Sequence, residues 1–338
     1  MFGRQSANGG GRGPQFPSIP RRRMELTRSY APDWILVIVI TGCFYFLDSI
    51  HGYWREFSLT EPSIQHTFTE KERVPNWMLG VLALVLPAVL MPVINAMTIR
   101  SWWDWHNSWL GLLLSLSLTA VLTQTVKVTV GRPRPDLIAR CQPKQGSQDT
   151  SPYGLVTASI CTQTDMSKLK DGFRSFWSGH SSLSFAGLGF LSWYLAGKLR
   201  VFDRKGHTFK SFLAIAPLTG AMLVAISRTM DYRHHWHDVL VGSTVGLLLS
   251  FFAYHQYYPS LASSYSHSPF SPRIYPDELR IHRHAPSSVP LIGGYMDHTP
   301  DVEGGSGYDH EREGPVPPVT VPRDAGSEPV PLHHIGQQ

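Results

Sequence analysis

The chain has 338 residues, of which 42% are hydrophobic and 16% are charged, and its formal net charge is +5 at pH 7. The basic residues are spread along the chain and form no dense stripe, which argues against a nucleic-acid partner. The three cysteines form no CxxC pair, so a zinc ribbon and a thioredoxin-like redox motif are both excluded.

Six apolar segments dominate the middle of the chain, and a helix of roughly 20 apolar residues can cross a bilayer core. Tryptophan and tyrosine residues lie at their edges, as in an aromatic belt. A soluble helical bundle would need polar stripes that these segments lack. We therefore predict an all-α, polytopic membrane protein with a six-transmembrane helical bundle. The predicted spans are 34–51, 77–97, 109–126, 183–196, 212–226 and 239–257.

The two ends of the chain differ from the middle in composition. Residues 259–338 hold 13 of the 26 prolines, with many Ser, Gly and His residues and no apolar periodicity. Such a segment buries too little apolar surface to offset its ordering entropy. We expect disordered tails at 1–30 and 259–338, on either side of a membrane domain at 31–258.

Basic residues in short loops favour the cytosolic side of a membrane. They are frequent before the first span and after the fourth, as in Arg21, Arg22, Arg23, Lys198 and Arg200. The other loops then face the lumen or the cell exterior, on an endomembrane (vacuole, Golgi or endoplasmic reticulum) or on the plasma membrane. Those loops are also basic, an exception that a bound anion would explain.

Two of the cysteines, Cys141 and Cys161, share one of these outward loops. They could form a disulfide if the loop faces an oxidising lumen. Two unpaired thiols are the alternative.

The most informative polar cluster lies just before the sixth span and contains His234 and Asp238. Residues four apart share one face of a helix. A carboxylate at that spacing can bind one imidazole nitrogen and leave the other free to attack. The alternative is a set of interfacial polar residues without a catalytic role.

A second cluster, Ser178-Gly179-His180, comes just before the fourth span. Gly179 permits a close backbone approach, and backbone donors at a helix start favour an anion. His180 could protonate a leaving oxygen. By itself this short sequence also fits an ordinary loop turn.

A third cluster ends the third span and supplies Lys127 and Arg134, with prolines that stop the helix. The planar guanidinium of arginine and the compact charge of lysine both suit phosphate oxygens. Cations at the end of a span can instead be snorkelling.

All three clusters fall on one predicted side of the membrane, and their chemistry is complementary for phosphoryl transfer. Cations and amides can stabilise the charge on the transferred group. The concentration of positive charge would repel a divalent metal ion. We therefore expect a phosphate site with no metal and no cofactor.

These residues resemble the signature of the type 2 phosphatidic acid phosphatase superfamily, the lipid phosphate phosphatases, written KxxxxxxRP, PSGH and SRxxxxxHxxxD. The third motif is matched by Ser227, Arg228, His234 and Asp238 at the family spacing. One position departs from the pattern, because Trp177 stands where the family has proline. The resemblance covers about residues 34–257, and the overall chain looks most like fungal diacylglycerol pyrophosphate and phosphatidate phosphatases.

The resemblance implies metal-independent hydrolysis through a phosphohistidine. By position, His234 would be the nucleophile, Asp238 its orienting partner and His180 the general acid. The phosphate-holding residues would be Lys127, Arg134, Ser178, Gly179 and Arg228. The substrate would be phosphatidate, diacylglycerol pyrophosphate or a related lipid phosphate. Alternatives are a lipid phospho-headgroup transferase of the same fold and a catalytically silent membrane scaffold, for which Trp177 is the one supporting feature.

Overall fold

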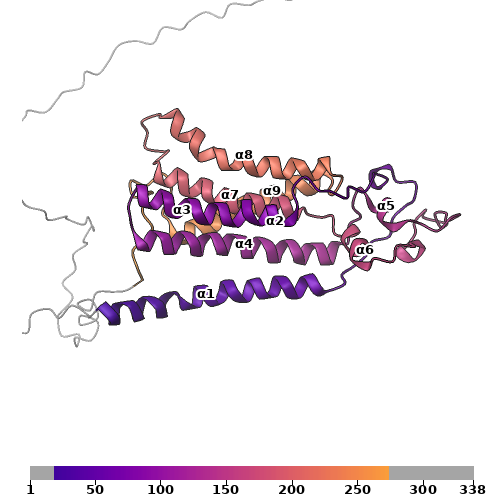
Figure 1. Cartoon of the computed structure of the whole chain (residues 1–338), viewed down its shortest axis with the longest axis horizontal. Helices are drawn as coiled ribbons and strands as arrows, with labels where there is room; N and C mark the ends of the chain where they lie inside the picture. Colours follow the sequence, from indigo (N-terminus) through magenta and orange to yellow (C-terminus); the bar gives the residue numbers. More distant parts are fainter. Residues whose placement is uncertain (1–18, 274–338) are drawn as a thin grey trace, which may run out of the picture. The chain divides into compact units, whose positions relative to one another are not determined.

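The computed structural model describes residues 19–273, and the side chains from residue 24 onward. The described residues contain helices and three isolated bridges but no β-strand, which confirms the all-α prediction. In chain order the helices are α1 (Ile19–Ser49), η1 (Pro62–Ile64), α2 (Asn76–Gly80), η2 (Val81–Val85), α3 (Leu86–Met97), α4 (Trp102–Val130), α5 (Leu137–Cys141), η3 (Ala158–Ile160), α6 (Met166–Gly172), α7 (Gly179–Lys198), α8 (Thr208–Met230) and α9 (Trp236–Tyr257). The segment η2 is a π-helical stretch inside the continuous helix 76–97 (Figure 1).

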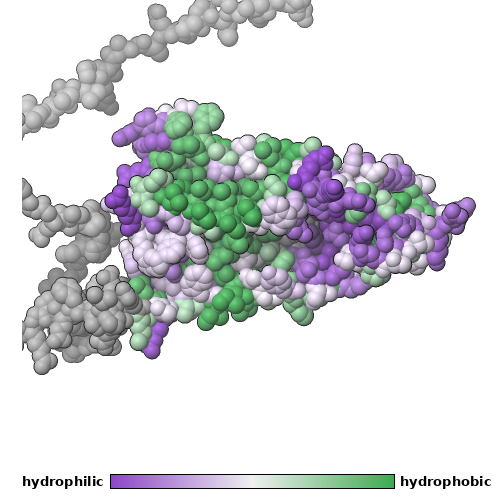
Figure 2. Space-filling view, in the orientation of Figure 1, coloured by the Kyte–Doolittle hydropathy of each residue, from purple (hydrophilic) through white to green (hydrophobic). Residues whose placement is uncertain are grey.

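Five of the described helical segments are long and apolar enough to cross a membrane: Met24–Ser49, Asn76–Met97, Trp102–Val130, Thr208–Met230 and Trp236–Tyr257. They coincide with five of the predicted spans. Large apolar side chains on these segments are exposed at the protein surface; Ile38 is 66% exposed and Phe212 is 71% exposed. Figure 2 shows such apolar residues over the helical part of the visible face. Surface of this kind is what contact with lipid requires.

The remaining predicted span, the fourth (183–196), corresponds to α7, which has 20 residues and is not among these five segments. Helix α7 is surrounded by other helices, with α4, α8 and α9 packed against it (Figure 1). Because its neighbours cover it, α7 needs little lipid-facing apolar surface and can carry buried serines such as Ser182 and Ser184. The six-span count therefore remains a prediction, although 20 residues of helix extend about 30 Å.

Two glycines let the neighbours of α7 reach its backbone. A Cβ added at Gly187 would lie 1.9 Å from the carbonyl oxygen of Ala83 on η2. A Cβ added at Gly246 on α9 would lie 2.1 Å from the carbonyl oxygen of Ser182. Only glycine fits at such distances, so these contacts fix α7 and with it the position of His180.

The predicted tail boundaries are wrong by several residues at both ends. Helix α1 begins at Ile19, inside the segment assigned to the N-terminal tail. After α9, the chain stays packed on the bundle: Ser266 is buried, and Lys198 Nζ donates to the carbonyl oxygen of His267 at 2.6 Å. The buried Asp104 accepts a second bond from the same ammonium at 2.6 Å, which holds this end of the bundle together. Residues 1–18 and 274–338, where the rest of both predicted tails falls, lie outside the described residues.

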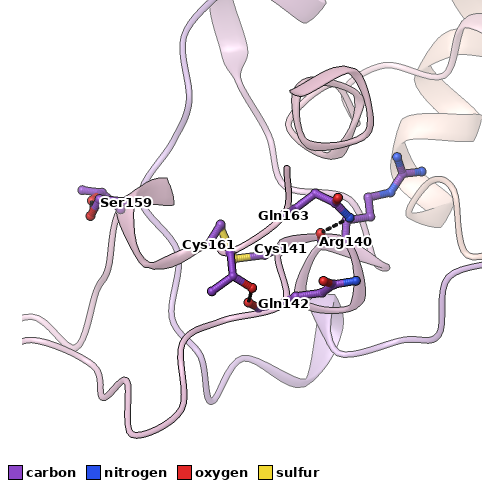
Figure 3. Close-up of a disulfide and its surroundings, with 8 residues drawn as sticks. Arg140, Cys141, Gln142, Ser159, Cys161 and Gln163 are labelled. Carbon is purple, nitrogen blue, oxygen red and sulfur yellow. Dashed lines mark hydrogen bonds between the residues drawn. A yellow bond between two sulfur atoms is a disulfide. The ribbon is translucent and has the colours of Figure 1, made fainter. Parts of the chain in front are cut away.

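Beyond one end of the bundle, η1, α5, η3, α6 and the loops around them form a small cap, defined here as residues 52–74 and 135–173. Its own apolar core contains Phe57, Ile64, Leu137, Cys141, Val156, Leu169 and Phe173. A disulfide joins Cys141 to Cys161 across a sequence separation of 20 residues (Figure 3). Beside it, the Gln163 side chain donates to the carbonyl oxygen of Arg140 at 3.3 Å. The sequence left open whether Cys141 and Cys161 form a disulfide or remain free thiols, and the structure shows the disulfide.

The disulfide should be a main source of stability for the cap, because it closes a 20-residue loop around a small core. We expect Cys161→Ser to lower the free energy of unfolding by about 2–5 kcal/mol. The midpoint of thermal unfolding in detergent, followed by tryptophan fluorescence, measures this. Cys43→Ser is the control, since Cys43 is a free, exposed cysteine on α1. Equal midpoints for both variants would contradict the expectation.

Candidate active site

A polar cavity of about 420 Å³ lies where the cap meets the helix bundle. The end of α4, the start of α7, the end of α8 and the loop before α9 all reach it, so the three sequence clusters do converge. Five of the predicted site residues line it: Lys127, Arg134, His180, Arg228 and His234. In Figure 2 hydrophilic residues gather toward the end of the molecule that carries α5 and α6.

His234 lies in the short loop between α8 and α9 and is 4% exposed. Its Nδ1 donates to the carbonyl oxygen of Ser175 at 2.6 Å, since a carbonyl can only accept. Burial, and then the charges of Arg134 and Lys127, hold the pKa of His234 well below its usual value. The imidazole is therefore neutral, with the proton on Nδ1 and the lone pair on Nε2.

Asp238 is not the hydrogen-bond partner of His234 that the sequence predicted. Its Oδ1 accepts from Arg132 at 2.7 Å, and its Oδ2 accepts from the hydroxyl of Ser175 at 2.5 Å. The reason is that His235 is the N-cap of α9, so His234 precedes the helix and the spacing of four does not apply. The carboxylate turns back to the His235 N–H, in a capping box.

Asp238 thus reaches His234 only through Ser175. The hydroxyl of Ser175 binds the carboxylate, and the carbonyl of the same residue holds the imidazole. Ser175 is fully buried, and its backbone N–H donates to the carbonyl oxygen of Arg132 at 3.1 Å, so its position is fixed on several sides. The sequence offered no signal for this role, because it depends on a backbone carbonyl.

His180 and Gly179 open α7, and Ser178 is the N-cap. The Nε2 of His180 donates to the carbonyl oxygen of Val74 at 3.0 Å. A Cβ added at Gly179 would lie 3.2 Å from Nζ of Lys127, so the glycine gives the ammonium room beside the helix start. This places the lysine next to the first turn of α7, where backbone donors favour anions.

Ser178 differs from the prediction, because it is fully buried and does not line the cavity. Its backbone N–H donates to the carbonyl oxygen of Asp238 at 3.0 Å, and its hydroxyl accepts from Ser181. Ser178 therefore holds the start of α7 against α9.

Trp177 is anchored despite the absence of the family proline. Its indole N–H donates to the hydroxyl of Thr123 on α4 at 2.8 Å. Thr123 in turn contacts the hydroxyl of Ser182 at 2.9 Å. The side chain thus links the loop before α7 to α4, a role that tryptophan fulfils through its N–H group.

Arg134 and Arg228 each face a carboxylate within the cavity. Arg134 donates to Asp171 at 2.7 Å, and Arg228 donates to Glu72 at 2.8 Å. Burial raises the pKa of Asp171, but Arg134, followed by Arg140 and other cations, outweighs it and lowers the pKa to about 2. Asp171 is therefore ionised and compensates part of the local positive charge.

Several lining residues were not singled out from the sequence: Asp48, Glu72, Asn76, Ser167, Lys170, Asp171, Arg174 and Arg233. Glu72 and Asp171 come from the cap, and no local pattern connects them with the signature. Arg233 could have been found from the sequence, because it directly precedes His234 in the third motif. In total the cavity is lined by six Lys or Arg and three Asp or Glu side chains. Within residues 19–273 no group of three or more His, Cys, Asp or Glu could hold a metal ion.

Comparison with known proteins identifies the family of the chain. Residues 108–261 match the family described as the PAP2 superfamily. Lipid phosphate phosphatase 2 of Arabidopsis thaliana is 38% identical over 245 residues, 72% of this chain and 82% of that protein. The probable diacylglycerol pyrophosphate phosphatase 1 of Schizosaccharomyces pombe is 38% identical over 68% of this chain and 81% of its own length. Diacylglycerol pyrophosphate phosphatase 1 of Saccharomyces cerevisiae is 37% identical over 68% of this chain and 80% of its own length.

No solved structure matches the chain. The sequence matches alone cover more than two thirds of the relatives at well above 30% identity. The chain therefore belongs to the PAP2 superfamily, the superfamily of the lipid phosphate phosphatases, and is a membrane-embedded enzyme of that group.

Proposed function

We propose that the protein hydrolyses phosphatidate, diacylglycerol pyrophosphate or a related lipid phosphate through a phosphohistidine, without a metal ion. The observation that carries this proposal is the state of His234. Its Nδ1–H is fixed on the Ser175 carbonyl, which leaves the Nε2 lone pair as a nucleophile at a cavity lined with cations.

In the first step, the phosphate oxygens are held by Lys127, Arg134 and Arg228. The Nε2 atom of His234 attacks phosphorus, and the bond between phosphorus and the leaving oxygen breaks. Burial, followed by the charges of Arg228 and Lys127, lowers the pKa of His180 to about 3 in the phosphate-free protein. A bound phosphate dianion favours the protonated form, in which His180 donates the proton that the leaving oxygen takes up. The cations stabilise the charge on the transferred phosphoryl group.

In the second step, water attacks the phosphorus of the phosphohistidine. His180 accepts a proton from that water, the bond from phosphorus to nitrogen breaks, and inorganic phosphate leaves. His180 is thereby protonated again, so the cycle needs no redox partner. The fixed cations neutralise the phosphate oxygens, which is the task that a metal ion performs in other phosphatases.

A second cavity, of about 410 Å³, supports a lipid substrate. It is apolar and lies between the helical segment 76–97, α7 and α8, with Leu82, Leu188 and Gly220 among its lining residues. Val74 is one of its lining residues, and the carbonyl oxygen of Val74 binds His180, which lines the polar cavity. A phosphate in the polar cavity would therefore have apolar space beside it for an acyl chain.

The proposal extends to the side of the membrane on which the active site lies. We place the active site on the lumenal or extracellular face, because the basic loops expected in the cytosol lie at the other helix ends. The cap disulfide supports this, since disulfides persist in oxidising compartments.

The function is tested by phosphate release from phosphatidate and from diacylglycerol pyrophosphate in detergent micelles, in excess EDTA. We expect release by purified protein that orthovanadate inhibits. His234→Ala should lower kcat by at least about 10³-fold, because the nucleophile is gone. His207→Ala is the control, since His207 is an exposed histidine before α8.

The other outcomes of this assay distinguish the alternative functions. Release that requires added metal would refute the metal-independent mechanism. Phosphate transfer to a second lipid in place of release would identify a transferase, and inactivity toward both lipids would favour the scaffold alternative.

Asp238 should act as a positioning residue through Ser175. We expect Asp238→Ala and Ser175→Ala each to lower kcat by about 10–100-fold with little change in KM. The carbonyl that orients His234 would lose its support, whereas the phosphate-binding cations would stay in place. If Ser175→Ala kept full kcat while Asp238→Ala lost it, the relay through Ser175 would be wrong.

The apolar cavity should determine how well long acyl chains bind. A Cβ added at Gly220 would meet only Leu188, at an ordinary 3.6 Å, so Gly220→Ala serves as a tolerated control. Gly220→Phe should fill the cavity and raise KM for long-chain phosphatidate by about tenfold, a loss of about 1.4 kcal/mol. KM for a short-chain, water-soluble phosphatidate should not change. Equal effects on both substrates would show that the chain binds elsewhere.

A further inference from the structure

Residues 66–74 of the cap, called the strap here, contribute Glu72 to the lining of the polar cavity and are bound to neighbouring loops near both ends. At the first end, the backbone N–H of His66 donates to the Pro135 carbonyl at 2.9 Å, and its ring stacks on Tyr232 at 4.4 Å. At the other end, Arg73 forms an ion pair with Asp231, and its backbone N–H donates to the same carboxylate at 2.9 Å. The strap is thus held beside the loop that carries His234.

Between these anchors, the carboxylate of Glu72 joins two arginines. Its Oε2 accepts from Arg228 at 2.8 Å, and its Oε1 lies 2.9 Å from Nη2 of Arg233. Arg228 is one of the cations assigned to the substrate phosphate. Carboxylate and phosphate oxygens use the same arginine geometry, so Glu72 stands where phosphate oxygens would bind.

Arg228 also binds a second carboxylate, and the two differ in their access to the cavity. Asp231 is fully buried and lies 3.2 Å from Nη2 of Arg228. The Glu72 side chain is 26% exposed and lines the cavity. Departure of Glu72 would therefore leave Nη2 of Arg228 paired with Asp231, while Nη1, which donates to Glu72, became free.

The surroundings of Arg233 suit its guanidinium to binding an anion. Its side chain is 7% exposed, and its Nε is buried without a hydrogen-bond partner among the described residues. The ring of Phe68, also on the strap, lies 4.8 Å from the guanidinium and supports its plane. A buried, unpaired guanidinium N–H costs free energy unless a ligand satisfies it.

Charge balance favours the exchange of Glu72 for phosphate. The six cations and three carboxylates that line the cavity leave an excess of positive charge. A phosphate group carries about −1.5 to −2 charge at pH 7, more than the single charge of Glu72. A phosphate that displaces the Glu72 carboxylate from the arginines thus neutralises more of the excess positive charge.

We infer that Glu72 is an internal competitor of the substrate phosphate. In the substrate-free enzyme its carboxylate occupies Arg228 and Arg233, and the phosphate displaces it on binding. Arg233 then becomes a further phosphate-binding arginine, outside the signature motif. This inference rests on the proposed function for the identity of the phosphate site.

The alternative role for Glu72 is to orient the arginines for the phosphate. The two roles predict opposite effects of Glu72→Gln, which keeps the shape of the side chain but removes its charge. A competitor that occupies the arginines for about nine-tenths of the time weakens phosphate binding about tenfold. Its removal should therefore lower the dissociation constant by that factor.

The experiment is the binding of inorganic phosphate to the full-length protein in detergent, measured by calorimetry. We expect Glu72→Gln to bind phosphate about tenfold more tightly than the unmodified protein. Glu70→Gln, on the exposed part of the same strap, removes the same charge and should leave binding unchanged. Unchanged or weaker binding by Glu72→Gln would overturn the inference.

Two further variants keep the test decisive. If Glu72→Gln does not fold, Glu72→Asp keeps the charge with a shorter reach and should still tighten binding, by a smaller factor. In the Glu72→Gln background, Arg233→Gln should weaken phosphate binding by at least threefold, at about 0.7 kcal/mol. No change would remove Arg233 from the phosphate site.

Binding and hydrolysis separate this inference from the proposed function. Tighter phosphate binding by Glu72→Gln together with no hydrolysis of either lipid would leave the competitor intact and refute the enzyme activity. Hydrolysis by the unmodified protein, together with weaker phosphate binding by Glu72→Gln, would support the enzyme activity and refute the competitor role of Glu72.

Discussion

The structure around the cavity depends on one electrostatic constraint: six cationic side chains converge at one end of a membrane-embedded bundle. Cations held together away from water repel one another and lose hydration. Asp171 and Glu72 compensate part of this charge, and both come from the cap. The cap is thus an electrostatic part of the site, and the charge that remains uncompensated is suited to a phosphate.

Helix α7 connects the membrane constraint to the site. An outer span must present apolar side chains to lipid, but α7 is enclosed by α4, α8 and α9 and can therefore be polar. Its N-terminus carries His180 and Gly179, and close contacts at Gly187 and Gly246 fix where that terminus lies. The apolar cavity lies beside the same helix, so one element carries both the proposed general acid and part of the wall of the proposed acyl-chain site.

The orientation of His234 shows how a backbone group can do the work assigned to a carboxylate. Asp238 is committed to the N-terminus of α9 and to Arg132, where its charge compensates helix donors and a guanidinium. The Ser175 carbonyl binds the imidazole in its place. A neutral carbonyl fixes the tautomer without adding a negative charge beside the proposed nucleophile, which would favour the approach of a phosphate.

The helical fold class, five of the spans and the position of the three clusters on one side of the membrane could be predicted from the sequence, because apolar periodicity and motif spacing can be read along one chain. The sequence also identified Lys127, Arg134, His180, Arg228 and His234, all of which line the cavity. The tertiary structure was needed to show that the Ser175 carbonyl holds His234, that Ser178 supports the start of α7, and that Glu72 binds Arg228 and Arg233. These roles depend on where helices begin and on contacts between residues more than 50 positions apart in the chain, such as Arg228 with Glu72 at a separation of 156. Distant contacts of this kind leave no periodic pattern in one sequence.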